Sequence, residues 1–255
     1  MTCFGEVPAP SGYARYLAAK TTVDDRALNR HVLAELCRLM PAGAPRVLEV
    51  GAGLGTMAAR LMDWGVVATG EYILLDADRQ LLDCSRRWLR DWAAARGLRS
   101  ELLPDGLRVG DLRVRLVHAD FGSYLAAAHG AAADVLIANA VLDLVDVPAV
   151  LPGLLRLLVP GGVYWFTISY DGESIFVPGH PRDDQIMQAY HRDMDERVRY
   201  GRPAGRGKPD GPPPVSPPAG CGGGRAGSGA VGLGRVPGPG REVPGRRGLL
   251  FAQHP

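Results

Sequence analysis

Short apolar runs alternate with amphipathic stretches between residues 47 and 168 of the 255-residue chain. A short apolar run is typical of a buried strand, whereas apolar residues that recur at helical spacing indicate an amphipathic helix. The predicted strands are 47–50, 72–75, 107–109, 114–118, 134–138 and 163–168, and the predicted helices are 56–64, 79–96, 124–129 and 148–158. This alternation indicates parallel strands joined by helical crossovers. We therefore predict an α/β fold with a doubly wound, mainly parallel sheet.

Residues 1–40 precede this alternation and are predicted to form an N-terminal helical cap. Apolar residues recur at mostly helical spacing over 13–40, with one interruption near Thr22. Thr22 or Asp24 is the predicted N-cap of a second helix, and Pro41 follows its end.

Residues 201–255 differ in composition from the rest of the chain. They hold 16 of the 34 glycines and 11 of the 21 prolines and show neither helical nor strand periodicity. Such a segment buries too little apolar surface to offset the entropy lost on ordering. We predict one α/β domain at 41–200 and a disordered tail at 201–255. A reading-frame shift near residue 205 would explain the abrupt change, and a genuine disordered tail is the alternative.

The formal net charge of +2 is unevenly distributed. Residues 201–255 contain 8 basic and 2 acidic residues, which leaves 21 basic and 25 acidic residues in 1–200. A mildly acidic folded part gives no electrostatic reason to expect nucleic-acid binding. The N-terminal MTCFGEVPAP lacks the features of a signal peptide, and no apolar stretch is long enough to span a bilayer. We expect a cytoplasmic protein with no membrane partner, and the sequence does not indicate an oligomeric state.

Candidate chemistry begins at VLEVGAGLGT, residues 47–56, where three glycines follow a predicted strand at alternate positions. Glycine tolerates positive φ and lets a ligand approach the backbone closely. Dinucleotide-binding loops have the pattern GxGxxG, whereas here Gly51, Gly53 and Gly55 are followed by Thr56. Glu49 also precedes the loop, and a carboxylate repels a pyrophosphate but attracts a cation. The alternative is a tight turn that binds no ligand.

This stretch resembles the first motif of class I S-adenosylmethionine-dependent methyltransferases, an acidic residue followed by GxGxG. Further motifs of the family match YILLDAD, VHADF, IANAVLDLVD and LVPGGVYWF, in the expected order and at predicted strand ends. The resemblance covers roughly residues 13–170. It implies an S-adenosylmethionine-dependent methyltransferase domain at 41–200 that acts on a small molecule by in-line methyl transfer. The family's usual C-terminal β-hairpin is expected to be missing, because the predicted strands end by residue 168.

The resemblance also implies which residues bind the cofactor. Asp76 would hold the ribose hydroxyls, Asp120 and Phe121 would meet the adenine, and Asn139 would border the methionine. The full implied set is Glu49, Gly51, Ala52, Gly53, Gly55, Asp76, Ala77, Asp120, Phe121, Asn139 and Ala140.

Each of the polar residues also has an ordinary structural interpretation. Asp76 and Asp120 could each cap the helix that follows, and Glu49 could pair with a basic residue. Phe121 could be a core residue and Asn139 a turn residue.

The acceptor site is expected between the N-terminal helices and the segment after residue 168. Tyr16, Tyr170 and Asp171 are the leading substrate-binding candidates, and the wider set adds Tyr13, Lys20, Arg26, Asn29, Glu173, His180, Tyr190 and His191. The sequence indicates no catalytic nucleophile, and its four cysteines and six histidines lack metal-site spacing. An NAD-dependent oxidoreductase and an inactive cofactor-binding protein with an incomplete core are the alternative functions.

Overall fold

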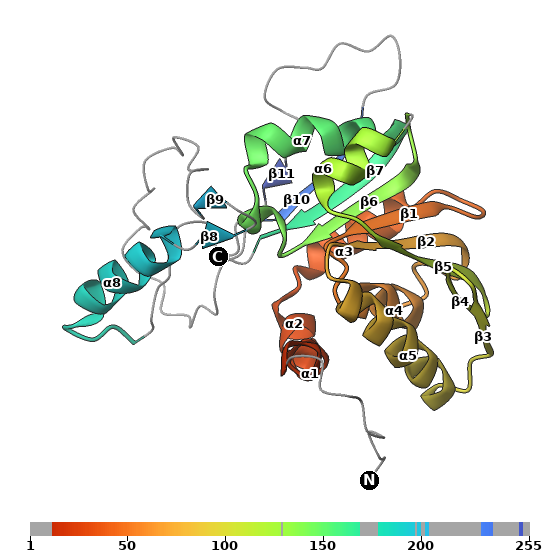
Figure 1. Cartoon of the computed structure of the whole chain (residues 1–255), viewed down its shortest axis with the longest axis horizontal. Coiled ribbons are helices and arrows are strands. Elements are labelled where there is room, and N and C mark those ends of the chain that lie inside the picture. Colours follow the sequence, from red (N-terminus) through yellow and green to blue (C-terminus); the bar gives the residue numbers. More distant parts are fainter. Residues whose placement is uncertain are drawn as a thin grey trace.

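A computed structural model describes residues 12–128, 130–168, 178–196, 198–199, 202–203, 231–236 and 250–251. A nine-stranded sheet forms its centre (Figure 1). The strands are β1 (Arg46–Val50), β2 (Thr69–Asp76), β3 (Ser100–Leu103), β4 (Gly106–Val109), β5 (Asp111–His118), β6 (Ala133–Asn139), β7 (Leu158–Thr167), β10 (Val231–Arg235) and β11 (Leu250–Phe251). Their order across the sheet is β11-β10-β7-β6-β1-β2-β5-β4-β3.

The five central strands run parallel, as the alternating pattern predicted. β1 pairs with β2 and β6, while β5 and β7 extend the parallel sheet on either side. The carboxyl ends of all five strands therefore lie at one edge of the sheet, where such folds bind ligands. The predicted α/β, doubly wound, mainly parallel sheet is confirmed.

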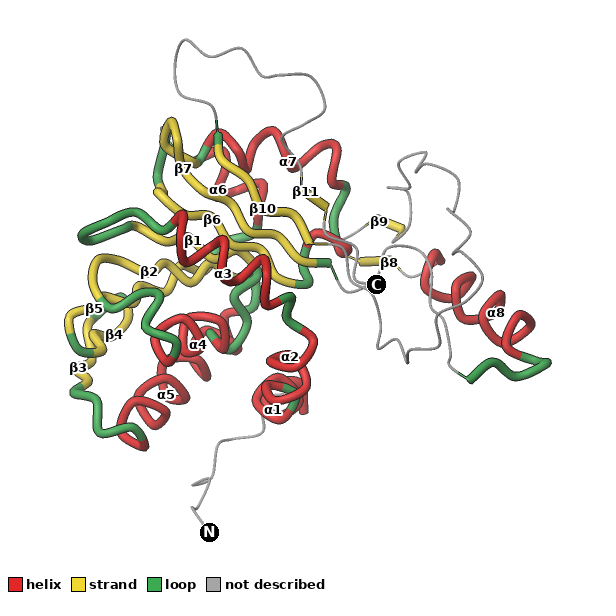
Figure 2. The backbone as a smooth tube through the Cα atoms, turned by 180° about the vertical axis from the view of Figure 1, so that it is seen from behind, coloured by secondary structure: helices red, strands yellow, loops and turns green. Residues whose placement is uncertain are grey.

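Helices cover both faces of the sheet (Figures 1 and 2). α3 (Arg30–Leu39), α4 (Thr56–Asp63) and α5 (Arg79–Ala95) pack on one face through residues such as Leu36, Leu61 and Leu89. α6 (Phe121–Ala127), the 3₁₀ helix η1 (Leu142–Leu144) and α7 (Val147–Arg156) pack on the other. Two apolar layers thus enclose strands that are buried on both sides, which explains their nearly continuous apolar sequences.

The N-terminal cap differs from the prediction because it contains three helices. α1 (Gly12–Ala19) and α2 (Thr21–Ala27) precede α3. The Asn29 side chain caps α3 by accepting hydrogen bonds from the backbone N–H groups of His31 and Val32, at 3.0 and 3.2 Å. The predicted caps at Thr22 and Asp24 are wrong, since both lie inside α2.

The sheet also has antiparallel strands at its edges. The predicted strand at 107–109 is β4, which pairs antiparallel with β5 and with β3, a strand that was not predicted. On the other edge, β10 was not predicted either and pairs antiparallel with β7 and with β11. Whether the family's usual C-terminal hairpin is missing stays a prediction. The pairing of β10 with β7 depends partly on Gly234, where a Cβ would collide with the Tyr164 hydroxyl group. Glycine lets this short strand lie flat against β7, and Leu233 is buried there.

Three further elements lie at the side of the sheet: α8 (Asp183–Glu196), β8 (Val198–Arg199) and β9 (Arg202–Pro203). α8 stands apart from the sheet in both views (Figures 1 and 2). Of the predicted tail, the structure describes residues 202–203, 231–236 and 250–251, and the rest lies outside the described residues. The boundaries 1–40, 41–200 and 201–255 therefore remain a prediction.

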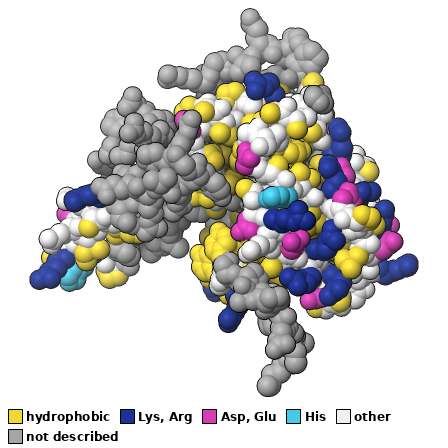
Figure 3. All heavy atoms as spheres, viewed as in Figure 1, with side chains coloured by type: hydrophobic (Ala, Val, Ile, Leu, Met, Phe, Trp, Pro, Cys, Tyr) yellow, Lys and Arg dark blue, Asp and Glu magenta, His cyan; other side chains and the backbone are white. Residues whose placement is uncertain are grey.

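Basic and acidic side chains are interspersed over the face that carries α5 (Figure 3). Two pairs illustrate this mixing: Arg96 with Asp63 at 2.6 Å, and Arg90 with Asp91 at 3.2 Å. In the part of the chain that the structure describes, no helix combines the length and the apolar character needed to cross a membrane.

Candidate functional site

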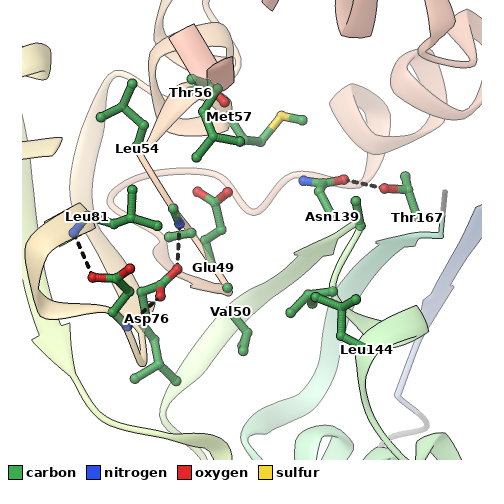
Figure 4. Close-up of a pocket in the computed structure, with 18 of the residues that line it drawn as sticks. Glu49, Val50, Leu54, Thr56, Met57, Asp76, Leu81, Asn139, Leu144 and Thr167 are labelled. Carbon is green, nitrogen blue, oxygen red and sulfur yellow. Dashed lines mark hydrogen bonds between the residues drawn. The ribbon is translucent and has the colours of Figure 1, made fainter. Parts of the chain in front are cut away.

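A cavity of about 1010 Å³ opens at the carboxyl ends of the parallel strands. It is large enough for a nucleoside-sized ligand together with a second small molecule. Most of the predicted residues line it, namely Glu49, Gly51, Ala52, Gly53, Asp76, Ala77, Asp120, Phe121, Asn139, Ala140 and Tyr16. Figure 4 shows Glu49 between Asp76 on one side and Asn139 on the other. The structure thus brings together residues from the ends of four strands.

Not every candidate lies in this cavity. Gly55 is the N-cap position of α4 and is not part of the lining. Of the wider acceptor set, Tyr13, Lys20 and Asn29 line the cavity, whereas Arg26, His180, Tyr190 and His191 do not. Tyr170, Asp171 and Glu173 lie outside the described residues.

The glycines of the loop are required by the protein's own packing, whether or not a ligand binds there. Gly51 has a φ of 64°, and a Cβ there would meet Val141 Cγ2 at 2.5 Å. Gly53 has a φ of 54°, and a Cβ there would lie 3.2 Å from Leu17 Cδ1. Both glycines are therefore required by backbone conformation and by close neighbours. The loop passes under α1 on one side and against the segment after β6 on the other.

Glu49 is the buried carboxyl group of the site, with only 3% of its surface exposed. The Tyr72 hydroxyl donates a hydrogen bond to Glu49 Oε2 at 2.8 Å. Burial raises the pKa of Glu49 to about 8, although the Tyr72 hydrogen bond and the charge of Arg60 act in the opposite direction. The carboxyl is therefore mostly protonated at neutral pH, and a nearby cation would favour its charged form.

Asp76 is held in place by the backbone on two sides. Its Oδ2 accepts from the Gly53 N–H at 2.7 Å, and its Oδ1 accepts from the Asp78 N–H at 2.8 Å. Burial raises the pKa of Asp76, and these two hydrogen bonds partly offset the effect. The capping role belongs to Asp78, whose Oδ1 accepts from Leu81 N–H at 3.1 Å. Asp76 joins the end of β2 to the glycine loop, so its carboxyl is fixed beside the cavity.

Asp120 caps the helix that follows it and lines the cavity as well. Its carboxylate accepts from the Ser123 backbone N–H at 2.9 Å and from the Ser123 hydroxyl at 2.7 Å. These bonds hold the pKa of Asp120 below its usual value. The helix α6 begins at Phe121 and not at residue 124 as predicted, because this cap lies further upstream. Phe121 is half-buried, packs against the second apolar layer and also lines the cavity.

The end of β6 has a strained backbone at Ala140 and a side-chain N–H donor without a described partner at Asn139. Among the described residues, Ala140 is the one non-glycine with a positive φ, at 51°. Such a conformation costs about 1–3 kcal/mol and occurs preferentially at functional sites. Asn139 Oδ1 accepts from the Thr167 hydroxyl at 2.9 Å. Its Nδ2 is buried without a described hydrogen-bond partner and faces Glu49 in Figure 4.

The N-terminal helices form one wall of the cavity. α1 contributes Leu17, which lies over Gly53, and α2 is attached to α4 through Arg60. The Arg60 guanidinium is buried and donates to the Asp25 carboxylate, to the Thr21 carbonyl oxygen at 3.0 Å and to the Asp24 carboxylate at 3.4 Å. Because a buried cation needs charged partners, this cluster ties the cap to the sheet domain.

Several residues of the site were not predicted from the sequence, among them Leu17, Arg60, Tyr72 and Thr167. Tyr72 and Leu17 look like ordinary apolar positions, so the sequence carries no signal for their contacts. Arg60 is different, because it follows Thr56 by one helical turn on the side of α4 that faces the cavity. A basic residue inside an otherwise apolar helix face could have suggested a buried ion pair.

Nothing among the described residues resembles a metal centre, since no group of three histidine, cysteine or acidic side chains converges. The carboxyl groups of the cavity instead lie beside backbone N–H donors and a buried hydroxyl. This arrangement suits a ligand that carries hydroxyl groups and positive charge.

Comparisons with known proteins give similarities of structure alone. No family model matches the sequence, and no curated protein matches it. A Bacillus halodurans C-125 protein provisionally described as a methyltransferase is 15% identical, with a TM-score of 0.41, over 68% of this chain and 62% of that one. The precorrin-6y C5,15-methyltransferase of Geobacter metallireducens GS-15 is 16% identical, with a TM-score of 0.37, over 55% and 62% of the two chains.

An S-adenosylmethionine-dependent methyltransferase of Mesorhizobium loti is 21% identical, with a TM-score of 0.34, over 55% of this chain and 54% of that one. The chain thus spans between about half and three-fifths of the length of these structures. Similarities of this size carry no conclusion about activity. The strand order places β10 antiparallel beside the parallel series β7-β6-β1-β2-β5.

Proposed function

We propose that the protein is an S-adenosylmethionine-dependent methyltransferase that acts on a small-molecule acceptor. The observation that carries this proposal is the fixed pair of carboxyl groups beside the glycine loop. Asp76 is bonded to the Gly53 N–H at 2.7 Å, and Glu49 lies buried at the end of the neighbouring strand. One carboxylate suits the hydroxyl groups of a ribose, and the other suits a positively charged group.

The residues present fit this cofactor better than a dinucleotide. Asp76 would hold the ribose, Glu49 would face the positively charged end, and Asp120 and Phe121 would border the base. Asn139 would border the methionine and methyl end of the same ligand. A pyrophosphate would instead meet the acidic groups of this cavity.

Within the described part of the chain, the cavity also offers a pyrophosphate no free basic side chain. The two basic residues of the described lining, Arg60 and Lys20, are already paired with acids of α2. The acidic side chains of the cavity, and the pairing of its basic ones, therefore favour S-adenosylmethionine over NAD.

When bound, S-adenosylmethionine supplies a methyl group on a sulfonium, and an acceptor lone pair forms the new bond while the sulfur keeps the electrons of the broken one. The chain's own residues would bind the two reactants, orient them toward each other and exclude water. Such positioning accounts for much of the acceleration in a methyl transfer. α1 and α2 cover the cavity, while the ends of β1, β2 and β6 form its floor. No catalytic base is assigned, because the acceptor determines whether a proton has to leave.

Calorimetry of the full chain with S-adenosylhomocysteine and with NADH tests this proposal. We expect binding of the first ligand and none of the second. Asp76→Asn should weaken binding of S-adenosylhomocysteine by roughly tenfold or more, because charge-assisted hydrogen bonds contribute about 1.5–3 kcal/mol. Asp83→Asn on the exposed side of α5 is the matched control and should leave the affinity unchanged. Binding of NADH without S-adenosylhomocysteine would favour the oxidoreductase instead.

We also propose that residues 41–200 form the catalytic domain, with 1–40 as its cap and 201–255 as its tail. We propose that the protein acts in the cytoplasm. Chymotrypsin digestion followed by mass spectrometry tests the boundaries. A protected fragment that ends near residue 200 would support them, whereas protection that continues through β10 would extend the domain, as the pairing of β10 with β7 suggests.

A further inference from the structure

Beyond the residues proposed for the cofactor, the cavity continues toward the N-terminal helices and the end of β7. This part, here called the acceptor half, is lined by Tyr13, Tyr16, Leu28, Met57, Leu144 and Trp165. The set is mainly apolar and contains three aromatic rings. It therefore suits a ligand with a substantial apolar surface.

Aromatic area is left uncovered in this half. Tyr13 and Tyr16 belong to α1 and are 51% and 56% exposed. Their rings stack, with centroids 6.0 Å apart and planes inclined by 20°. In Figure 3, hydrophobic side chains gather over α1 and α2 at the lower end of the molecule. Stacked, half-exposed rings at a cavity mouth offer a flat ligand a surface with little loss of side-chain entropy.

Both basic residues that line the cavity among the described residues are already neutralised. Lys20 Nζ lies 3.0 Å from Asp24 Oδ1. Arg60 contacts the carboxylates of Asp24 and Asp25. An anionic acceptor would therefore meet no available basic side chain in the described lining of the cavity. It would also lie near Asp143, a further acidic residue of the lining.

The floor of the acceptor half carries two buried N–H donors without described partners. These are Trp165 Nε1 and Asn139 Nδ2. In the register of β6 and β7, Trp165 lies opposite Ile137, and Asn139 lies opposite Thr167, so all four side chains share one face of the sheet. A buried donor without an acceptor costs about 1–3 kcal/mol, and a ligand oxygen would remove that cost. Both nitrogens are covered in this structure, so a ligand would reach them after a side-chain rotation.

We propose that the acceptor is an uncharged, flat aromatic molecule with a carbonyl or hydroxyl oxygen, bound between the Tyr13–Tyr16 pair and the sheet end that carries Trp165 and Asn139. The inference rests on the proposed function, because it assigns this half of the cavity to the molecule that is methylated. Three independent features lead to it: the exposed ring pair, the neutralised cations and the unpaired donors.

The test uses two probes of the same shape, 2-naphthamide and 2-naphthoate, titrated by NMR into the full chain with S-adenosylhomocysteine present. The amide is neutral and the carboxylate is charged. We expect the amide to bind at least roughly tenfold more tightly, because a buried charge without a counterion is strongly disfavoured. Tyr16→Ala should weaken amide binding by about fivefold, as expected for the loss of one aromatic contact.

Tyr190→Ala on α8 is the matched control, since this tyrosine is also exposed but does not line the cavity. Equal or tighter binding of the carboxylate would overturn the inference, and so would equal effects of the two tyrosine substitutions. If S-adenosylhomocysteine binds but 2-naphthamide does not, the inference fails while the proposed function stands. If S-adenosylhomocysteine does not bind, the proposed function fails and the inference fails with it.

Discussion

The Tyr72 hydroxyl donates a 2.8 Å hydrogen bond to Glu49 Oε2, which joins two buried side chains of the neighbouring strands β2 and β1. This contact stabilises the charged form of Glu49, but burial has the larger effect, and the pKa remains at about 8. A group that changes charge near neutral pH beside a cofactor site couples ligand binding to protonation.

Cofactor affinity should therefore depend on pH. Below about pH 8 Glu49 is protonated, and a positively charged ligand must displace that proton. The affinity for S-adenosylmethionine should rise by up to about tenfold per pH unit as the pH approaches 8 and then level off. Calorimetry across this range measures the effect. In Glu49→Gln the affinity should depend much less on pH. If the affinity of that variant changed with pH as in the original protein, Glu49 would not be the group responsible.

The same shift predicts how stability without ligand depends on pH. The folded protein binds a proton at Glu49 more tightly than the unfolded chain does, so the free energy of unfolding should fall as the pH rises from the ordinary pKa of 4.5 toward about 8. The free energy of unfolding of Glu49→Gln should equal that of the original protein near pH 4.5 and exceed it near pH 8. Urea unfolding at the two pH values makes this comparison. A constant difference between the two proteins would show that Glu49 does not titrate in this range.

Gly51→Ala should destabilise the protein more than a positive φ alone explains. Gly51 and Gly65 have nearly the same φ, 64° and 66°, but a Cβ at Gly65 meets nothing within 4 Å. Gly65→Ala should cost about 1–2 kcal/mol through backbone strain. Gly51→Ala should cost clearly more because of Val141, and Val141→Ala should recover part of the difference. Equal losses at the two glycines in thermal unfolding would mean that Val141 moves aside freely.

Arg60→Met should loosen the helical cap without unfolding the sheet. The substitution leaves Asp24 and Asp25 without their buried partner, and we expect a loss of about 1–3 kcal/mol. Hydrogen exchange should become faster in α1 and α2 and stay slow in β1 and β2. Arg96→Met breaks the exposed pair with Asp63 and should cost less than about 1 kcal/mol. Similar exchange patterns in the two variants would rule out a special role for the Arg60 cluster.

The sequence predicted the parallel strands and the residues at their ends because both are encoded locally. An apolar run marks a buried strand, and Glu49, Asp76 and Asn139 each stand beside such a run. The three-helix cap was missed because Asn29 interrupts a helical pattern that continues across it. β10 was missed because a strand rich in glycine has no apolar alternation, and its place depends on Tyr164.

Side-chain partners that are distant in sequence could not be predicted. Tyr72 contacts Glu49 across 23 residues, and Arg60 contacts Asp25 across 35. These contacts depend on register and on helix packing, which no local pattern specifies. They nevertheless determine the charge state of the site and the attachment of the cap.

Leu17 lies over Gly53, so the first helix rests directly on the loop where the cofactor is proposed to bind. A movement of that helix would widen the path by which a molecule as large as S-adenosylmethionine is exchanged. If that movement were slower than methyl transfer, product departure would limit turnover. Under that regime, variants that weaken the Arg60 attachment would turn over faster at saturation while holding their ligands less tightly.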